Sequence, residues 1–332
     1  MKRYSILFTL FFIAGFLRAQ SAVESMGCRE FLSISGNDTA HILIKSLKGE
    51  ENIPKPLLFF CQGSLPVPLI ITSAQGNFPP FPFSTDSLCK KYHLVIVGKP
   101  GVPVVADEKN LAPGFVYVDP ETGKMPAYYV QNNLPEFYVQ RNLRAIKMLQ
   151  ELSFVSSERL VVAGHSQGAS IAARMAAEDK TITRLIFASG NPMGQIMSMI
   201  GASRAHENDS TQDGEMQLKY WSETCAHKSD LNDQQGDTYK SVYDFSEPSM
   251  NYLRELKIPV LVSYGTVDYS TPFIDYMRVD FTRDGKKNFT YNAYVNRDHN
   301  FFGVKPDGRP DYDNFGWDIV ATDWMKWLED QE

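Results

Sequence analysis

A serine lies between two glycines where residues 164–168 read GHSQG, the pattern G-x-S-x-G. The apolar run 159–163 precedes this pattern and predicts a buried strand, and the alanine-rich run 169–178 after it predicts a helix. A strand, a short turn and a helix in this order hold the serine hydroxyl on a sharp turn above the end of the strand. Glycines are needed on both sides, because a Cβ there would collide with neighbouring backbone. The context therefore predicts that Ser166 is a nucleophile.

A serine alcohol is a poor nucleophile, so it needs a base that takes its proton and a carboxylate that orients the base. His299 follows the predicted strand 288–295, and Asp268 follows the predicted strand 258–263. Both positions lie just beyond a strand, where the side chains can reach the edge of the sheet that carries the serine turn. We expect His299 to be the base and Asp268 to be the acid that orients it.

These segments resemble the α/β-hydrolase family. The turn at 164–168 matches the family's nucleophile turn, and GTVDYSTP at 265–272 is similar to its strand-Gly-x-x-Asp-x-x-x-Pro segment. The resemblance covers nearly all of the chain after residue 19, and it implies a catalytic triad in the chain order Ser166, Asp268, His299. It also implies the α/β fold class, with the α/β-hydrolase fold: a mostly parallel central sheet, helices on both faces and a cap insertion.

The tetrahedral intermediate of acyl transfer needs donors aimed at its oxyanion, normally two backbone amides. The amide of Gln167, directly after the nucleophile, is the first candidate. The second lies in the turn after the predicted strand 57–61, where Gln62-Gly63-Ser64 resembles the His-Gly-x oxyanion turn of the family. The sequence departs from that pattern by having Gln62 in place of histidine, so either Gly63 or Ser64 supplies the second amide, and we favour Ser64.

Other titratable residues compete for these roles. Asp298 adjoins His299, but neighbours in sequence normally point apart, so we expect Asp298 to be a loop carboxylate. His165 lies inside the serine turn and is expected to pack beside it. His206 and His227 are candidates for lining the pocket.

Strand-like and helix-like segments alternate along the chain, as in a mostly parallel sheet covered on both faces. The expected strands are 31–35, 41–46, 57–61, 93–97, 159–163, 183–189, 258–263 and 288–295. The expected helices are 84–91, 136–152, 169–178 and 317–328.

Residues 191–257, here called the cap insertion, follow the sixth expected strand and contain no clear strand pattern. In the family such an insertion shapes the choice of substrate. Its Met197 and Trp221 either face the pocket or pack the insertion against the core. Its excess of acidic residues, Asp237 among them, indicates either a solvated surface or a site for a cationic group such as a peptide amine.

The N-terminus predicts a signal peptide. Lys2 and Arg3 precede the apolar run 6–17, and Ala19 is a small residue suited to cleavage. A run of this length is short of the roughly 20 residues that span a bilayer. We therefore expect a signal peptide at 1–19, an α/β-hydrolase domain at 20–332, a secreted or periplasmic location and no stable membrane anchor after cleavage.

Four cysteines follow the predicted signal peptide: Cys28, Cys61, Cys89 and Cys225. An exported protein meets oxidising conditions, and four cysteines allow three full disulfide pairings. The sequence does not decide among these pairings. Buried thiols are the other interpretation.

Composition narrows the function classes. The net charge of −6 and the absence of a Lys/Arg-rich run argue against a nucleic-acid partner. No metal or cofactor is required by the expected mechanism. The first hypothesis is therefore a carboxylic-ester hydrolase that acts on a small-molecule acyl substrate.

Three other functions stay open. A serine peptidase or aminopeptidase of the same fold, acting on a short peptide, would use the same residues. Acyl transfer to an acceptor other than water is a further option. A non-catalytic binding module is less favoured, because such relatives lack part of the triad. The oligomeric state is open.

Overall fold

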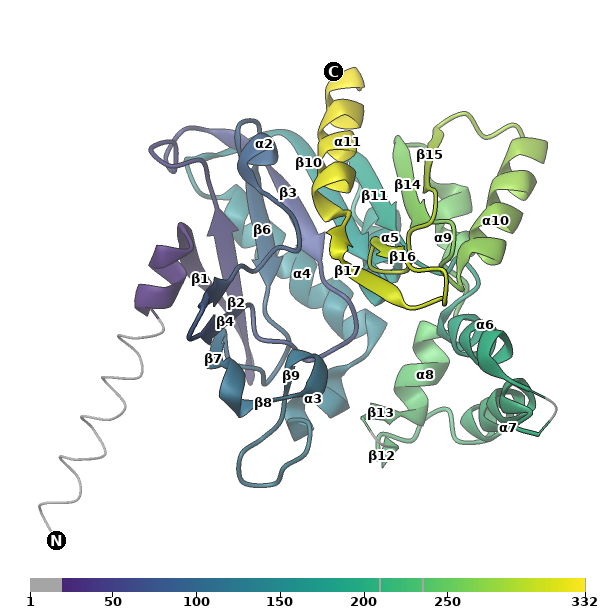
Figure 1. Cartoon of the computed structure of the whole chain (residues 1–332). Helices are drawn as coiled ribbons and strands as arrows, with labels where there is room; N and C mark the ends of the chain where they lie inside the picture. The colour runs from purple at the N-terminus through teal and green to yellow at the C-terminus, as the bar shows by residue number, and fades with distance from the viewer. Residues whose placement is uncertain (1–19, 209, 235, 332) are drawn as a thin grey trace, which may run out of the picture.

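An eight-stranded sheet forms the centre of the computed structural model, which describes residues 20–208, 210–234 and 236–331 (Figure 1). The predicted signal peptide at 1–19 lies outside the described residues. The strands run in the order β1-β2-β6-β3-β10-β11-β14-β15. They are β1 (Cys28–Ser35), β2 (Asp38–Lys45), β3 (Lys55–Cys61), β6 (His93–Val97), β10 (Val155–His165), β11 (Arg184–Ala188), β14 (Val260–Gly265) and β15 (Phe289–Tyr294).

Six of these strands, from β6 to β15, are parallel to one another, whereas β2 pairs antiparallel with both β1 and β6. Each of the eight strands expected from the sequence has its counterpart in this sheet. The predicted mostly parallel sheet is therefore confirmed.

Side chains alternate between the two faces along each strand, so both faces of the sheet carry apolar side chains. Helices cover both faces. In β3, Leu57 and Phe59 enter one core, and Leu58 and Phe60 enter the other. The first core is covered by α4 (Pro135–Gln150), α5 (Gln167–Glu178), α9 (Ser249–Glu255) and α10 (Thr271–Arg283), and the second by α2 (Asp86–Cys89) and α11 (Trp317–Asp330). Figure 1 shows α11 crossing one face of the sheet while α4 and α5 lie behind it.

The segment between β11 and β14 is helical. It contains α6 (Gln195–His206), α7 (Asp213–Ala226), α8 (Tyr239–Phe245) and a hairpin of β12 (Asp233–Gln234) and β13 (Asp237–Thr238) before α9. In Figure 1, α6, α7 and α8 lie together at the lower right, and of the three α8 reaches the core beside α5 with Phe245. The helix α9 buries Met250 and Leu253 in the same core beside α5.

Several elements were not expected from the sequence. Outside the cap insertion the longest is α10, although Pro272 in its first turn and the buried Ile274, Met277 and Phe281 at helical spacing carry the signal for it. Smaller elements are β4 (Ile70–Ser73), β5 (Gly76–Phe78), β7 (Val105–Asp107), β8 (Leu111–Ala112), β9 (Val116–Tyr117), α3 (Ala127–Asn132), β16 (Phe302–Val304), β17 (Pro310–Phe315) and 3₁₀ turns at Glu108–Asn110 and Pro113–Phe115.

All four cysteines are free thiols. Cys28, Cys61 and Cys89 are buried, as in the interpretation as buried thiols, whereas Cys225 is exposed. Burial raises the pKa of Cys28 and Cys89 to about 11 and that of Cys61 to about 12, and these thiols are therefore protonated at neutral pH.

Candidate active site

Ser166 occupies a strained turn between β10 and α5. Its φ of 59° and ψ of −124° lie in a region that residues other than glycine rarely adopt. A Cβ on Gly164 would lie 2.1 Å from the carbonyl oxygen of Gly168, and one on Gly168 would lie 2.1 Å from that of Cys61. The two glycines are thus required by the close approach of backbone on both sides of the turn.

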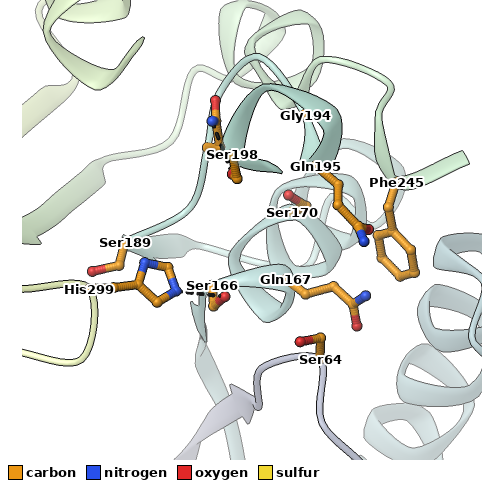
Figure 2. A pocket seen from close by; sticks show the side chains of 11 residues that line it. Ser64, Ser166, Gln167, Ser170, Ser189, Gly194, Gln195, Ser198, Phe245 and His299 are labelled. Atoms are coloured by element: carbon orange, nitrogen blue, oxygen red, sulfur yellow. Dashed lines mark hydrogen bonds between the residues drawn. The ribbon is translucent and has the colours of Figure 1, made fainter. Parts of the chain in front are cut away.

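His299 and Asp268 reach Ser166 from the loops after β15 and β14. The Nε2 atom of His299 lies 2.8 Å from Ser166 Oγ, and its Nδ1 atom lies 2.8 Å from Asp268 Oδ2. Asp268 is buried, and its Oδ1 accepts a hydrogen bond from the amide of Ser270 at 2.9 Å. The structure therefore brings together the three residues that the sequence selected, in one chain of hydrogen bonds (Figure 2 shows the link between His299 and Ser166).

Opposing effects set the pKa of His299. Burial lowers it, but the hydrogen bond to Asp268 and the negative charges of Asp268 and Asp298 outweigh burial and leave it above its ordinary value. Because the Asp268 carboxylate only accepts hydrogen bonds, Nδ1 must carry the proton, and Nε2 of the neutral ring faces the serine as an acceptor. This is the tautomer in which His299 can take a proton from Ser166.

Asp298 supports the loop that carries His299. Its Oδ1 accepts hydrogen bonds from the amides of Asn300 at 2.9 Å and Phe302 at 2.8 Å. Asp298 is therefore a loop carboxylate that closes the turn, and the imidazole Nδ1–H donates to Asp268 instead.

His165 also holds this loop in place. Its Nε2 donates to the carbonyl oxygen of His299 at 2.9 Å, and its ring packs against Trp317 with the centroids 5.0 Å apart. Burial, followed by the proximity of His299, lowers the pKa of His165 to about 3. The ring is therefore neutral, and it supports the His299 loop and does not act as the base.

The candidate oxyanion amides lie beside the serine. Gln167 is the first residue of α5, so its amide has no partner within the helix and lies at the positive end of the helix dipole. Gly63 lies across the turn, where an added Cβ would be 3.7 Å from Ser166 Cβ. Ser64 lines the cavity at the nucleophile. The hydroxyl of Tyr129 in α3 donates to the Ser64 carbonyl and fixes this loop.

No protein-family model matches the sequence, and no curated protein matches it. Solved structures do match. Est1E from Butyrivibrio proteoclasticus has a TM-score of 0.52 and 15% identity, over 91% of this chain and 98% of that chain. Acylaminoacyl peptidase from Pyrococcus horikoshii has a TM-score of 0.52 and 15% identity, over 82% of this chain and 37% of that chain. Porphyromonas gingivalis dipeptidyl peptidase 4 has a TM-score of 0.52 and 13% identity, over 91% and 35%.

The chain thus spans nearly the whole length of Est1E but only about a third of the two peptidases. The chain has the α/β-hydrolase fold. At these identities the likeness establishes the fold alone. In an α/β-hydrolase fold, Ser166, Asp268 and His299 stand after β10, β14 and β15, at the carboxyl edge of the parallel strands where such sheets bind ligands.

Two cavities meet at the nucleophile of this α/β-hydrolase fold. The first, here called the polar cavity, has a volume of about 190 Å³ and is bounded by α5, α6 and α8 (Figure 2). It is lined by Ser64, Ser166, Gln167, Ser170, Ser189, Asn191, Gly194, Gln195, Ser198, Phe245 and His299.

The second, here called the apolar cavity, has a volume of about 540 Å³ and lies between the Ser64 loop and the segment 78–82. Its side-chain lining is mostly aliphatic, aromatic and proline, and includes Leu65, Val67, Leu69, Ile71, Phe78, Pro79, Pro80, Phe81, Pro82 and Trp317.

The cap insertion lines the polar cavity with residues that the sequence did not single out. Gln195 and Ser198 come from α6 and Phe245 comes from α8, whereas Met197 and Trp221 line neither cavity at Ser166. Trp221 stacks on Tyr243 with the ring centroids 5.8 Å apart, so it packs within the insertion. The apolar inner face considered from the sequence is therefore wrong for these residues, and the cap insertion contributes Gln195, Ser198 and Phe245 instead.

The two histidines of the insertion also lie elsewhere. His206 contacts the hydroxyl of Tyr269, and His227 stacks on Tyr239. Neither lines the polar or the apolar cavity. Sequence position within an insertion carried no information about which side chains turn inward.

Across residues 20–208, 210–234 and 236–331, no cluster of three or more His, Cys, Asp or Glu side chains is arranged to hold a metal ion. Over the same residues, no helix has the length and apolar composition needed to span a membrane.

Proposed function

We propose that the chain is a serine hydrolase that cleaves a carboxylic ester through a triad of Ser166, His299 and Asp268. The observation that carries this proposal is the hydrogen-bonded series from Asp268 through His299 to a serine held on a strained turn. A structural serine has no need of a backbone conformation that costs on the order of 1–3 kcal/mol. The likeness in fold to Est1E and to two peptidases supports the same class of enzyme.

Each step of the reaction has a residue in position. His299 Nε2 takes the proton of Ser166 Oγ as the oxygen attacks the acyl carbonyl, and Asp268 stabilises the imidazolium that forms. The amides of Gln167 and Ser64 receive the oxyanion. His299 then gives its proton to the leaving alcohol, and water activated by the same ring releases the acid from Ser166.

A serine peptidase of the same fold is the second candidate, because acylaminoacyl peptidase and dipeptidyl peptidase 4 are among the matching structures. The same triad cleaves an amide when His299 protonates the leaving amine. Rates of hydrolysis measured on matched acyl esters and aminoacyl amides separate the two candidates.

We also propose that the protein is exported. Lys2, Arg3, the apolar run 6–17 and Ala19 support a signal peptide at 1–19 that is removed to leave residues 20–332. Within that domain we propose that 191–257 acts as the cap, which is supported by the contribution of Gln195, Ser198 and Phe245 to the polar cavity. N-terminal sequencing of the exported protein tests the cleavage site.

A fluorophosphonate probe tests the central proposal, because only an activated serine beside an oxyanion hole reacts rapidly with it. We expect stoichiometric labelling of the protein at Ser166 and none in Ser166→Ala. Ser170→Ala is the matched control, because Ser170 lines the same cavity but bonds Ser249 rather than a histidine. Undiminished labelling of Ser166→Ala would contradict the proposal.

A further inference from the structure

The polar cavity contains buried polar atoms that have no partner within the described part of the chain. They are Oε1 and Nε2 of Gln167, Oε1 of Gln195 and Oγ of Ser189. The Ser189 side chain belongs to a residue that is only 1% exposed and has a φ of 46°. Buried polar groups without a hydrogen bond are costly and rare in folded proteins. Four such atoms around one cavity beside a nucleophile indicate that the cavity binds a polar group.

Asp237 determines which end of Gln195 faces this cavity. The Nε2 atom of Gln195 donates to Asp237 Oδ2 at 3.5 Å, and a carboxylate offers only acceptors, so the amide nitrogen must point toward Asp237. The carbonyl oxygen Oε1 is then the buried atom of Gln195 that is left without a partner. Figure 2 shows the carboxamides of Gln195 and Gln167 directed toward the same space beside Phe245.

The charge around the cavity excludes ions as the preferred ligand. Asp237 does not line the cavity, and its oxygens already accept hydrogen bonds from Asn133, Gln195 and Ser241. The lining contains no Asp, Glu, Lys or Arg side chain. A cationic amine or a carboxylate would lose its hydration here without gaining an opposite charge. The remaining chemistry is that of neutral groups that both donate and accept hydrogen bonds, and among these hydroxyls best match the mixed wall of serine hydroxyls and carboxamides.

The apolar cavity begins at the same serine, but the side chains that line it are of a different kind. Its walls are the aliphatic side chains after Ser64, the Pro/Phe segment 78–82 and Trp317. Phe78 and Leu65 on its rim are 43% and 48% exposed, so apolar surface remains available to a ligand. Burial of an aromatic or long alkyl group against these side chains is favourable.

We propose that the substrate is an amphiphilic ester, with a small neutral hydroxylated group in the polar cavity and an aromatic or long alkyl group in the apolar cavity. This inference rests on the proposed ester hydrolysis, because it places the scissile carbonyl at Ser166 where the two cavities meet. It also disfavours substrates with a free amino terminus, since no carboxylate lines the polar cavity.

Two matched pairs of esters test the proposal. Glyceryl 3-phenylpropanoate is compared with propyl 3-phenylpropanoate, and phenethyl glycerate with phenethyl propanoate, so each pair differs only in hydroxyls on one side of the ester. We expect kcat/KM to favour the hydroxylated ester by about tenfold or more in one pair, and that pair identifies which side of the ester enters the polar cavity. An ester of 2-aminoethanol with the same acyl group should be cleaved no better than the propyl ester.

The near-isosteric variant Gln195→Leu removes the unpaired Oε1 acceptor of a residue that lines the polar cavity. It should lower the preference for hydroxyls, measured as the ratio of kcat/KM within the pair, at least fivefold. Gln140→Leu is the control, because Gln140 is exposed on α4 and bonds only Glu178. It should keep the wild-type preference.

Fluorophosphonate labelling at Ser166 separates a wrong substrate class from a wrong assignment as a serine hydrolase. If Ser166 is labelled but both pairs are cleaved without preference, or the aminoethyl ester is the best substrate, the substrate class is wrong and the hydrolase stands. The class is also wrong if Gln195→Leu keeps the preference. If Ser166 is not labelled and no ester is cleaved, the proposed function fails and the substrate class fails with it.

Discussion

At the scale of single residues, two carboxylates, Asp268 and Asp298, lie near His299 and have different roles. Asp268 accepts the hydrogen bond from Nδ1, while Asp298 accepts from two backbone amides of its own turn. An asparagine at 298 still has an oxygen for those amides. An asparagine at 268 cannot supply the charge that stabilises the imidazolium, and it can present its amide nitrogen to the ring and favour the wrong tautomer.

We therefore predict that Asp268→Asn lowers kcat by about ten-thousand-fold, the size of effect seen when a triad acid becomes an amide. Asp298→Asn should change kcat by less than about tenfold, because it disturbs only a loop charge. Steady-state kinetics on any cleaved ester measure both, with circular dichroism to show that both variants fold. The reverse ranking would mean that the roles of the two carboxylates have been exchanged.

The pH dependence of the reaction follows from the raised pKa of His299. The base acts only when neutral, so kcat/KM should rise with pH through an apparent pKa above 6.5 and fall at lower pH. Asp268 is the main cause of the raised pKa of His299. In Asp268→Asn, the rise of the remaining kcat/KM with pH should therefore occur at lower pH. A pH profile of kcat/KM for both proteins checks this, and a rise at the same pH would show that another group controls it.

At the scale of secondary-structure elements, the sequence predicted the parts that follow one regular pattern. The central strands were found because each is a short apolar run of a sheet buried on both faces, as His93–Val97 shows. The helix α10 was missed because Thr271–Arg283 mixes β-branched and aromatic residues with weak helix propensity, and because 265–272 had been interpreted as a loop motif.

The polar cavity could not be predicted in the same way. Gln195 and Phe245 are 50 positions apart, and only the packing of α6 with α8 brings them to one wall. Met197 and Trp221 of the same insertion have larger apolar side chains, but they line neither cavity at Ser166. Position along a helix decides which residue lines a site, and the insertion gave no periodic pattern from which that face could be read.

The short helix α3 gives a prediction at this scale. The Tyr129 hydroxyl donates to the Ser64 carbonyl, so it positions the loop whose amide we assign to the oxyanion hole. Tyr129→Phe should lower kcat roughly tenfold with little change in KM, because the loss of a supporting bond should cost less than the loss of an oxyanion donor itself. Tyr128→Phe on the same helix is the control, since Tyr128 bonds Asp38 instead. Equal kcat and KM in the two variants would show that the Tyr129 hydroxyl does not position the oxyanion loop.

At the scale of the whole molecule, the carboxyl edge of the parallel strands collects the groups that the fold does not use for packing. Ser64, Lys99, Ser166, Ser189, Asp268 and His299 follow β3, β6, β10, β11, β14 and β15. This explains why the triad was recognisable from the sequence before its distances were known: once the strands are assigned, topology alone places their ends together. It does not explain Lys99, which is 4% exposed and takes no part in the proposed reaction.

Lys99 makes the stability of the molecule depend on pH. Burial lowers the pKa of Lys99 to about 7, and the ring of Tyr138 lies 4.5 Å from its Nζ. Cys61, Arg141 and Asp237 also act on this group, with the nearby Asp237 and Cys61 opposing the effect of burial and Arg141 adding to it. In the unfolded chain the lysine holds its proton up to about pH 10. Between about pH 7 and 10 the unfolded state therefore binds more protons, and the free energy of unfolding gains from rising pH.

We predict that Lys99→Met raises the free energy of unfolding, and that the gain is largest at or below pH 7, where the wild-type protein must bury an ammonium group. Above pH 7 the buried amine becomes neutral, so the gain should shrink by up to about 1.4 kcal/mol for each pH unit. Denaturant unfolding of both proteins at pH 6 and pH 9 measures the difference and cancels the titration of the buried thiols, which both proteins share. A gain that is the same at both pH values would show that the folded protein keeps Lys99 charged, held by Tyr138 and Asp237, and that burial does not control its ionisation.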